Sequence, residues 1–244
     1  MDARSYDPNR YDRPSLTVDV VLFTLIAEEL HVLLLQRSRW PFAGNWALPG
    51  GFVRMDEGLD SAARRELAEE TGITEVYVEQ LFTFGAPERD PRTRVVSVAY
   101  LALVRADHQQ LRGSEEGSEV RWQPVARLPT PLAFDHALII ETAVQRLRSK
   151  LEYTTLAFQL LPTMFTLAEL YETYGQIFGG TRREDGSGEL EALDKRNFYR
   201  KITDAGILQD TGHFRDGRGR PAKLYRFQPA QQDGAFVFRW REAK

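Results

Sequence analysis

The sequence of 244 residues contains no cysteine, which excludes disulfide bonds, thiolate catalysis and zinc sites built from cysteine. This absence fits a reducing compartment, and we expect a cytoplasmic protein. No apolar run reaches the roughly 20 residues that a membrane-spanning helix needs. Residues 1–14 are polar and charged, so we expect no signal peptide. His136 and His213 belong to no ligand pattern, and core or solvent positions are expected for both.

The chain also lacks a strong overall charge, since 32 Lys and Arg stand against 35 Asp and Glu. Its 42% hydrophobic and 27% charged residues are typical of a globular protein. One segment differs from the rest: residues 195–226 hold nine basic side chains against three acidic ones, a net charge of +6. A basic segment within an otherwise acidic chain indicates contact with a polyanion at that place.

The first part of the chain has the pattern of a mixed α/β domain. The expected strands are rich in β-branched and apolar residues, and they are Thr17–Ala27, His31–Gln36, Val76–Phe84, Thr93–Val104 and Val120–Gln123. Two helices are expected, at Gly58–Thr71 and Asp135–Leu151. Gly72 is a plausible stop for the first of them.

The pattern changes after Pro162. A helix is expected at Thr166–Phe178, where Thr166 and Glu169 have the spacing of a capping box. The elements expected after it are a second helix and two short strands, at Leu193–Ala205, Ile207–Leu208 and Leu224–Phe227. Helix, turn, helix and hairpin is the order of a winged helix-turn-helix. We place the boundary near Lys150, which gives domains at residues 1–150 and 151–244.

Residues 50–73, GGFVRMDEGLDSAARRELAEETGI, carry an ordered motif. Its specified positions are Gly51, Glu57, Arg65, Glu66, Leu67, Glu69, Glu70, Gly72 and Ile73. Every position of the Nudix signature is present at the right spacing, and the chain is identified on this motif as a member of the Nudix superfamily. The resemblance implies an α/β fold, a Nudix αβα sandwich with a mixed sheet, followed here by the winged helix-turn-helix domain.

The motif also has a physical reading. On a helix, Glu66, Glu69 and Glu70 are at positions i, i+3 and i+4, so their carboxylates share one face and repel one another. A divalent cation such as Mg²⁺ or Mn²⁺ compensates such a cluster, because these ions prefer oxygen ligands. Gly50 and Gly51 allow the backbone to approach the metal closely. A solvated acidic helix face is the alternative.

The family resemblance assigns roles to these residues. It implies metal ligation by Glu66, Glu69, Glu70 and the carbonyl region of Gly51, and it implies a structural pair of Glu57 and Arg65. The three helix glutamates would be catalytic together with a general base on a later loop. The candidates for that base are Glu115, Glu116 and Glu119, and Glu116 is our prediction; simple solvent exposure of the loop is the alternative.

The ligand is predicted from weaker features. Phe84–Val98 resembles a stretch of ADP-ribose pyrophosphatases and their regulatory relatives, in which Pro87 falls close to a marker proline. The arginines that suit phosphate or ribose oxygens are Arg89, Arg92 and Arg94. A turn rich in Pro and Asp is the alternative for this segment. Trp40, Phe42 and Trp46 suit either stacking on a base or the core, and the core is favoured for Trp46.

The basic segment has the arrangement of a DNA-reading helix and wing. Phe198 and Ile202 lie one turn apart and are expected to face inward. The residues then left for DNA on the helix are Lys195, Arg196, Asn197, Arg200 and Lys201. The wing adds Arg218, Arg220 and Lys223 around a glycine-flanked tip.

The two parts together resemble the bacterial Nudix-related transcriptional regulators of NAD metabolism, from about Pro14 to Phe227. The resemblance rests on the Nudix box, LDKRNFYRKI at 193–202 and GRGRPAKLYRF at 217–227. It implies a homodimeric repressor that binds double-stranded DNA and releases it on binding ADP-ribose or a related nucleoside diphosphate. The chain departs from the pattern in an insert at Thr181–Glu191 and in its intact box. The alternative is a Mg²⁺-dependent ADP-ribose pyrophosphatase whose winged helix serves dimerisation.

Overall fold

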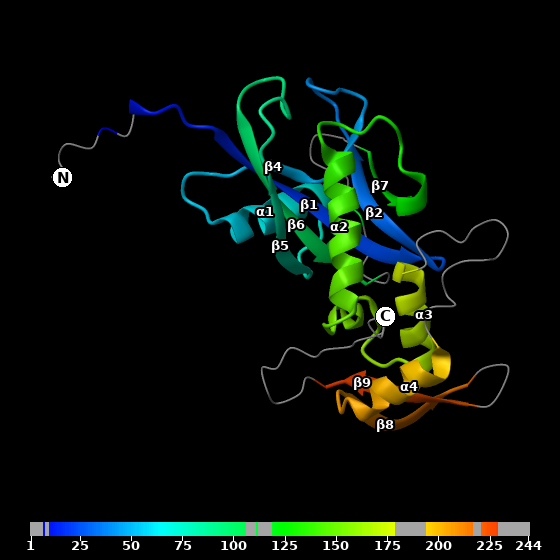
Figure 1. Cartoon of the computed structure of the whole chain (residues 1–244). Helices are drawn as coiled ribbons and strands as arrows, with labels where there is room; N and C mark the ends of the chain where they lie inside the picture. Colours follow the sequence, from blue (N-terminus) through cyan, green and yellow to red (C-terminus); the bar gives the residue numbers. More distant parts are fainter. Residues whose placement is uncertain are drawn as a thin grey trace, which may run out of the picture.

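The first domain is built on one mixed seven-stranded sheet (Figure 1). The structure is a computed structural model that describes residues 7, 10–105, 111, 119–178, 194–216 and 221–228. The strands of the sheet are β1 (Ser15–Ile26), β2 (Glu29–Gln36), β3 (Trp46–Ala47), β4 (Gly50–Phe52), β5 (Tyr77–Phe84), β6 (Val95–Leu103) and β7 (Val120–Pro124). The order is β3-β2-β1-β6-β5, with β4 beside β1 and β7 beside β2. Among the strand pairings of the described residues, only β1–β6 is parallel. The mixed sheet predicted from the sequence is confirmed.

Helices α1 (Leu59–Thr71) and α2 (His136–Leu151) cover opposite faces of this sheet. Side chains alternate between the faces of a strand, and β1 shows this directly. Val18, Val20 and Leu22 pack into the cluster that contains α1, whereas Val21 and Phe23 pack into the cluster that contains α2. The arrangement is therefore the expected αβα sandwich, with α1 ending at Gly72 in a left-handed conformation of φ +77°.

The second part has the order helix, helix, hairpin. Helices α3 (Leu167–Phe178) and α4 (Lys195–Asp204) are followed by the antiparallel strands β8 (Leu208–Arg215) and β9 (Ala222–Phe227). The winged-helix prediction is confirmed. Strand β8 is much longer than the predicted Ile207–Leu208, because its further residues are polar and mostly exposed and so carry no apolar signal. Strands β3 and β4 were not expected, since two or three residues show no periodicity.

The two parts share one hydrophobic cluster. It runs from Phe23 and Leu147 of the sandwich to Tyr174 and Phe198 of the winged helix. The 3₁₀ helix η5 (Leu156–Leu160) contributes to the same cluster. In addition, Arg148 Nε of α2 donates a hydrogen bond of 3.1 Å to the Ile177 carbonyl of α3. Helix α2 thus connects the sheet to the winged helix, as Figure 1 shows.

No helix in the described ranges is long and apolar enough to cross a membrane.

The capping box at the start of α3 generates a stability prediction. The Glu169 N–H donates to Thr166 Oγ1 at 3.2 Å, and the Thr166 N–H donates to Glu169 Oε2 at 2.7 Å. We expect Thr166→Ala to lower the free energy of unfolding by about 1 kcal/mol, because it removes one side of this box. Urea denaturation measures the change, with exposed Thr163→Ala as the matched control. Equal unfolding midpoints for the two variants would contradict the capping role.

Candidate functional site

Two glutamates of α1 converge on the backbone of β4. Glu70 Oε2 accepts a hydrogen bond of 2.8 Å from the Gly50 N–H. Glu66 packs so closely on Gly51 that a Cβ atom there would lie 2.3 Å from Glu66 Oε1. Glycine is therefore required at position 51 for this approach, because any side chain would displace the carboxylate. The box spacing thus brings Glu66 and Glu70 to one edge of the sheet.

Glu69 does not join this pair. Its carboxylate is half-exposed and lies 3.2 Å from Arg54 Nη2 and 3.1 Å from Arg65 Nη1. The two arginines compensate a charge that we expected a metal to compensate. In the described part of the chain no group of three or more Asp, Glu, His or Cys side chains is gathered to hold a metal ion. Metal ligation by Glu69 stays a prediction.

Glu57 and Arg65 form a two-bond ion pair, with Arg65 Nη2 at 2.6 Å and Nε at 2.9 Å from the Glu57 oxygens. These hydrogen bonds, with one from the Arg54 N–H, lower the pKa of Glu57 to about 2. Arg65 Nη1 also donates to Glu66 Oε1 at 2.7 Å. The pair anchors the loop before α1 to the helix and fixes Glu66 beside Gly51.

The negative charge of an ionised Glu70 would be poorly compensated by the protein. Burial raises its pKa to about 8, against the lowering effect of the Gly50 hydrogen bond, and the nearby carboxylates of Glu66 and Asp19 raise it further. Such a site favours the arrival of a cation, because an ionised carboxylate in a buried position needs a partner of opposite charge.

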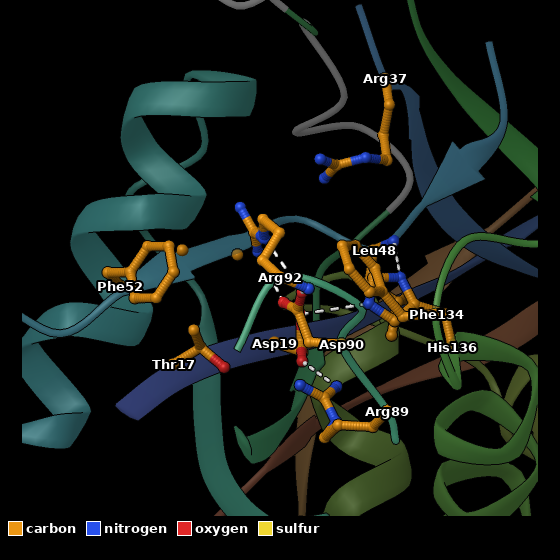
Figure 2. Close-up of a pocket in the computed structure, with 12 residues that line it drawn as sticks. Thr17, Asp19, Arg37, Leu48, Phe52, Arg89, Asp90, Arg92, Phe134 and His136 are labelled. Atoms are coloured by element: carbon orange, nitrogen blue, oxygen red, sulfur yellow. Dashed lines mark hydrogen bonds and ion pairs between the residues drawn. The ribbon is translucent and has the colours of Figure 1, made fainter. Parts of the chain in front are cut away.

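A cavity of about 180 Å³ opens beside this edge (Figure 2). Gly50 and Gly51 line it on the side of the box. The remaining lining is mainly charged and aromatic, and it comprises Thr17, Asp19, Arg37, Leu48, Phe52, Arg89, Asp90, Arg92, Phe134 and His136. The cavity therefore offers positive side chains within reach of the carboxylate pair.

Asp19 is the buried centre of this lining. Its carboxylate accepts hydrogen bonds from Ser97 Oγ and from Arg89 Nη2, the latter at 3.3 Å. His136 Nε2 lies 3.4 Å from its other oxygen, while His136 Nδ1 accepts the Leu48 N–H at 2.8 Å. Burial acts to raise the pKa of Asp19, but the interactions with His136, Ser97 and Arg89 outweigh burial and hold the pKa below its ordinary value.

The predicted ligand-binding residues have different environments. Arg89 is buried and makes two hydrogen bonds to Asp135, of 2.6 and 3.0 Å, besides its bond to Asp19. Arg92 lines the cavity, held by Asp90 at 2.7 Å. Arg94 is not among the lining residues; it is exposed and donates to the Ala86 and Val95 carbonyls.

Aromatic residues before the box also differ in position. Trp46 is half-buried against the core, with the Arg121 guanidinium 3.7 Å from its ring centroid. Trp40 is 70% exposed. Phe42 contacts Phe134 of the cavity edge to face, at 4.9 Å between ring centroids.

The lining residues that the sequence reasoning did not assign to the site include Asp19, Arg37, Phe134 and His136. His136 is buried, as the core alternative stated, but it faces the cavity and Asp19. These residues belong to β1, to the loop after β2 and to the start of α2. One signal was available for Asp19, a lone charge within the apolar run of β1.

The predicted DNA-reading residues that the structure describes lie on α4 and on β9. Phe198 and Ile202 are buried, as expected, and Lys195, Arg196 and Arg200 are exposed. Asp194 caps the helix by accepting the Asn197 N–H at 2.7 Å. Three further side chains are less exposed or already paired. Asn197 accepts a hydrogen bond from Arg200, and Lys201 is half-buried. Lys223 pairs with Asp210. Glu115, Glu116, Arg218, Arg220 and the insert at 181–191 lie outside the described residues.

Comparison with known proteins matches the Nudix domain family to residues 15–143 and the NrtR DNA-binding winged helix domain family to residues 157–227. The ADPR responsive transcriptional repressor NtrR of Acinetobacter baylyi is 38% identical over 237 residues, which are 96% of this chain and 89% of the relative.

Two solved structures are similar as well. Shewanella oneidensis NrtR complexed with a 27mer DNA matches with a TM-score of 0.74 and 41% identity, covering 87% of this chain and 93% of that one. The Nudix domain of the same protein, complexed with ADP ribose, matches with a TM-score of 0.53 and 43% identity, covering 59% and 95%.

The fold and the site define a class, a Nudix domain joined to a DNA-binding winged helix. Within that class, the chain belongs to the NrtR family of Nudix-related transcriptional regulators.

The environment of Arg89 predicts a structural role. We expect Arg89→Met to lower the free energy of unfolding by about 3 kcal/mol, because it leaves Asp19 and Asp135 without their shared positive charge. Exposed Arg94→Met, on the same segment, should change stability by no more than about 0.5 kcal/mol. Urea denaturation of both variants checks this. Equal stability of Arg89→Met and the parent protein would show that the guanidinium serves only the ligand.

Proposed function

We propose that the protein is a homodimeric, cytoplasmic repressor of NAD-related genes that releases DNA when its Nudix domain binds ADP-ribose or a related nucleoside diphosphate. The observation that carries the proposal is the presence, in one chain, of a cavity beside the Nudix carboxylates and of an exposed basic helix in a winged-helix fold. The NtrR and NrtR relatives named above match 96% and 87% of this chain, which is more than either part alone.

Helix α4 is the proposed reading element. Its buried Phe198 and Ile202 fix one side against α3, and this leaves Arg196 and Arg200 directed outward. Arginine suits both phosphate oxygens and guanine edges, because its planar fork donates two parallel hydrogen bonds. The predicted DNA contacts of Lys195, Asn197, Lys201, Lys223, Arg218 and Arg220 belong to the same proposal.

The described residues fit a divalent metal at Glu66 and Glu70. Mg²⁺ in proteins is commonly held by one or two carboxylates together with substrate phosphates and water. Two converging carboxylates, both with a pKa raised by burial, meet this requirement without a third. Gly51 adds backbone close to Glu66. When bound, the metal would neutralise phosphate charge and polarise a phosphoryl oxygen or water.

The cavity seats part of the proposed ligand. Its volume of about 180 Å³ is below the roughly 300–1,000 Å³ of pockets that enclose a whole drug-sized ligand. We place a diphosphate beside the carboxylate pair, in the cavity that Arg92 also lines. The nucleoside and the second ribose would then extend to the outer surface.

A gel-retardation assay with the protein's own upstream DNA tests the proposal. We expect a shift that weakens steeply between 50 and 200 mM salt, because phosphate contacts release counterions. ADP-ribose should release the DNA, and AMP and NAD serve as comparison ligands. Arg196→Ala with Arg200→Ala should weaken DNA binding by at least about 30-fold. Arg127→Ala, an exposed arginine of the first domain, is the matched control. If the variant with both α4 changes retarded DNA as well as the parent protein does, the proposed DNA-reading role of α4 would be contradicted.

Hydrolysis of the same ligand is the second candidate function, and the convergence of Glu66 and Glu70 favours it. Wild-type protein with Mg²⁺ should convert ADP-ribose to AMP and ribose 5-phosphate. Glu70→Gln should abolish this conversion and weaken Mn²⁺ binding by at least about tenfold. The amide oxygen can still accept the Gly50 hydrogen bond, so the fold should persist. Exposed Glu75→Gln is the control. Full turnover and unchanged Mn²⁺ affinity in Glu70→Gln would contradict the metal-binding role.

A further inference from the structure

The hairpin of β8 and β9 is attached by backbone pairing to the segment that begins α3. The Phe165 N–H donates to the Tyr225 carbonyl at 3.0 Å, and the Tyr225 N–H donates to the Phe165 carbonyl at 2.8 Å. Strand β9 therefore lies between Phe165 on one edge and β8 on the other. This pairing acts within β9, whereas the far end of the hairpin is reached at Arg215, the last residue of β8.

The Arg215 side chain reaches across β9 to the same segment. Its Nη1 donates to Glu169 Oε1, and its Nη2 donates to the Met164 carbonyl at 3.2 Å. The residue opposite Arg215 on β9 is Ala222, and directly opposed residues of an antiparallel pair point to the same face. The small side chain of Ala222 leaves room for the longer one to cross. The far end of the hairpin is thus attached to the start of α3 by a side chain.

Glu169 uses its two oxygens for two different contacts. Oε2 accepts the Thr166 N–H in the capping box, and Oε1 accepts the bond from Arg215. An ion pair on the surface contributes little when two free side chains must be ordered to form it. Here the capping box already orients the carboxylate, so less side-chain entropy is lost in the contact with Arg215. The two side chains are 43% and 34% exposed, so water screens the contact only in part.

Helix α3 connects this contact with the proposed reading helix. The ring of Phe198 on α4 packs against Tyr171 and Tyr174 of α3, at 5.4 and 5.2 Å between ring centroids. The position of α4 is therefore set by α3, and Glu169 of α3 sets the position of the hairpin end.

We propose that Arg215 is a positioning residue for DNA binding, which through Glu169 holds the far end of the hairpin in a fixed orientation relative to α4. This inference rests on the proposed function and deepens it. Side chains alternate along a strand, so Phe214 and Lys223, which are opposed in the hairpin, point to the face away from Arg215. Lys223 is one of the predicted DNA contacts. A hairpin that is ordered in advance loses less conformational entropy when DNA binds.

Fluorescence anisotropy of labelled upstream DNA with the full-length protein tests this role through the sign of one charge change. Glu169→Gln removes a negative charge from the DNA-binding part, and charge alone would strengthen binding. Its amide oxygen can still accept the Thr166 N–H, because Gln also serves in a capping box. We expect Glu169→Gln and Arg215→Gln each to weaken DNA binding by about three- to tenfold, because the hairpin must then be ordered on binding. The double variant should lose no more than either single variant, since both remove the same contact.

Three controls accompany these variants. Glu172→Gln removes an exposed glutamate of the same helix and should bind DNA as the parent does or slightly more tightly. Arg215→Lys keeps the charge and one donor, so its loss of affinity should be smaller than that of Arg215→Gln. Amide hydrogen exchange without DNA should be faster in the hairpin of Glu169→Gln and Arg215→Gln and unchanged in α3.

The outcomes separate this inference from the proposed function. Unchanged or tighter binding in Glu169→Gln beside weaker binding in Arg215→Gln would overturn the inference, because Arg215 would then contact phosphate directly. Parent-like binding in both variants would also overturn it and leave the proposed function intact. If the wild type does not bind the upstream DNA, the proposed function fails. Faster exchange of the hairpin in the variants would then show a contact that serves the fold alone, which overturns the positioning role as well.

Discussion

The buried carboxylate of Asp19 is the interaction on which the site depends. It lies on β1 and accepts hydrogen bonds from Ser97 of β6 and from Arg89 of the segment after β5, while His136 at the start of α2 faces its other oxygen. A buried charge is tolerated only when it is paired and hydrogen-bonded, so each of these partners must keep its place. Gly50 packs against the same residue, since a Cβ there would lie 2.9 Å from Asp19 Oδ1. One carboxylate thus ties together two strands, a loop, a helix and the edge of the Nudix box.

The same interaction connects the cavity with the DNA-binding part. Helix α2 begins with His136 against Asp19, and its last turns pack into the cluster that contains Tyr174 of α3 and Phe198 of α4. The hydrogen bond from Arg148 to the Ile177 carbonyl adds a polar link at the same place. Protein interiors are close-packed, so elements joined by such a core respond together to displacement. The physical path from the ligand cavity to α4 is contiguous and runs through α2.

Local spacing made much of this structure predictable from the sequence. The Nudix box placed Glu66 and Glu70 on α1, and Thr166 with Glu169 marked the start of α3, because both patterns act within a few residues. The position of Glu69 was not predictable in this way, since it depends on Arg54, a residue of the loop before the helix. In the sequence, Arg89 looks like an exposed arginine of a loop. In the structure it is buried and bonded to Asp19 and Asp135, two residues that are distant from it in the chain. The cavity is assembled by tertiary contacts, and its lining was accordingly found only in part.

An intact box does not by itself make an enzyme. Among the described residues, Glu66 Oε1 accepts a bond from Arg65 and Glu70 Oε2 accepts one from Gly50, which leaves one oxygen of each carboxylate for a metal. Holding a diphosphate needs that metal and a positive side chain, which the arginines of the cavity lining supply. Hydrolysis needs one group more, a base positioned at the attacking water. Glu69, the remaining box carboxylate, is engaged by Arg54 and Arg65. The described residues of α1 therefore supply the carboxylates that binding a ligand requires, whereas hydrolysis requires a base in addition to them.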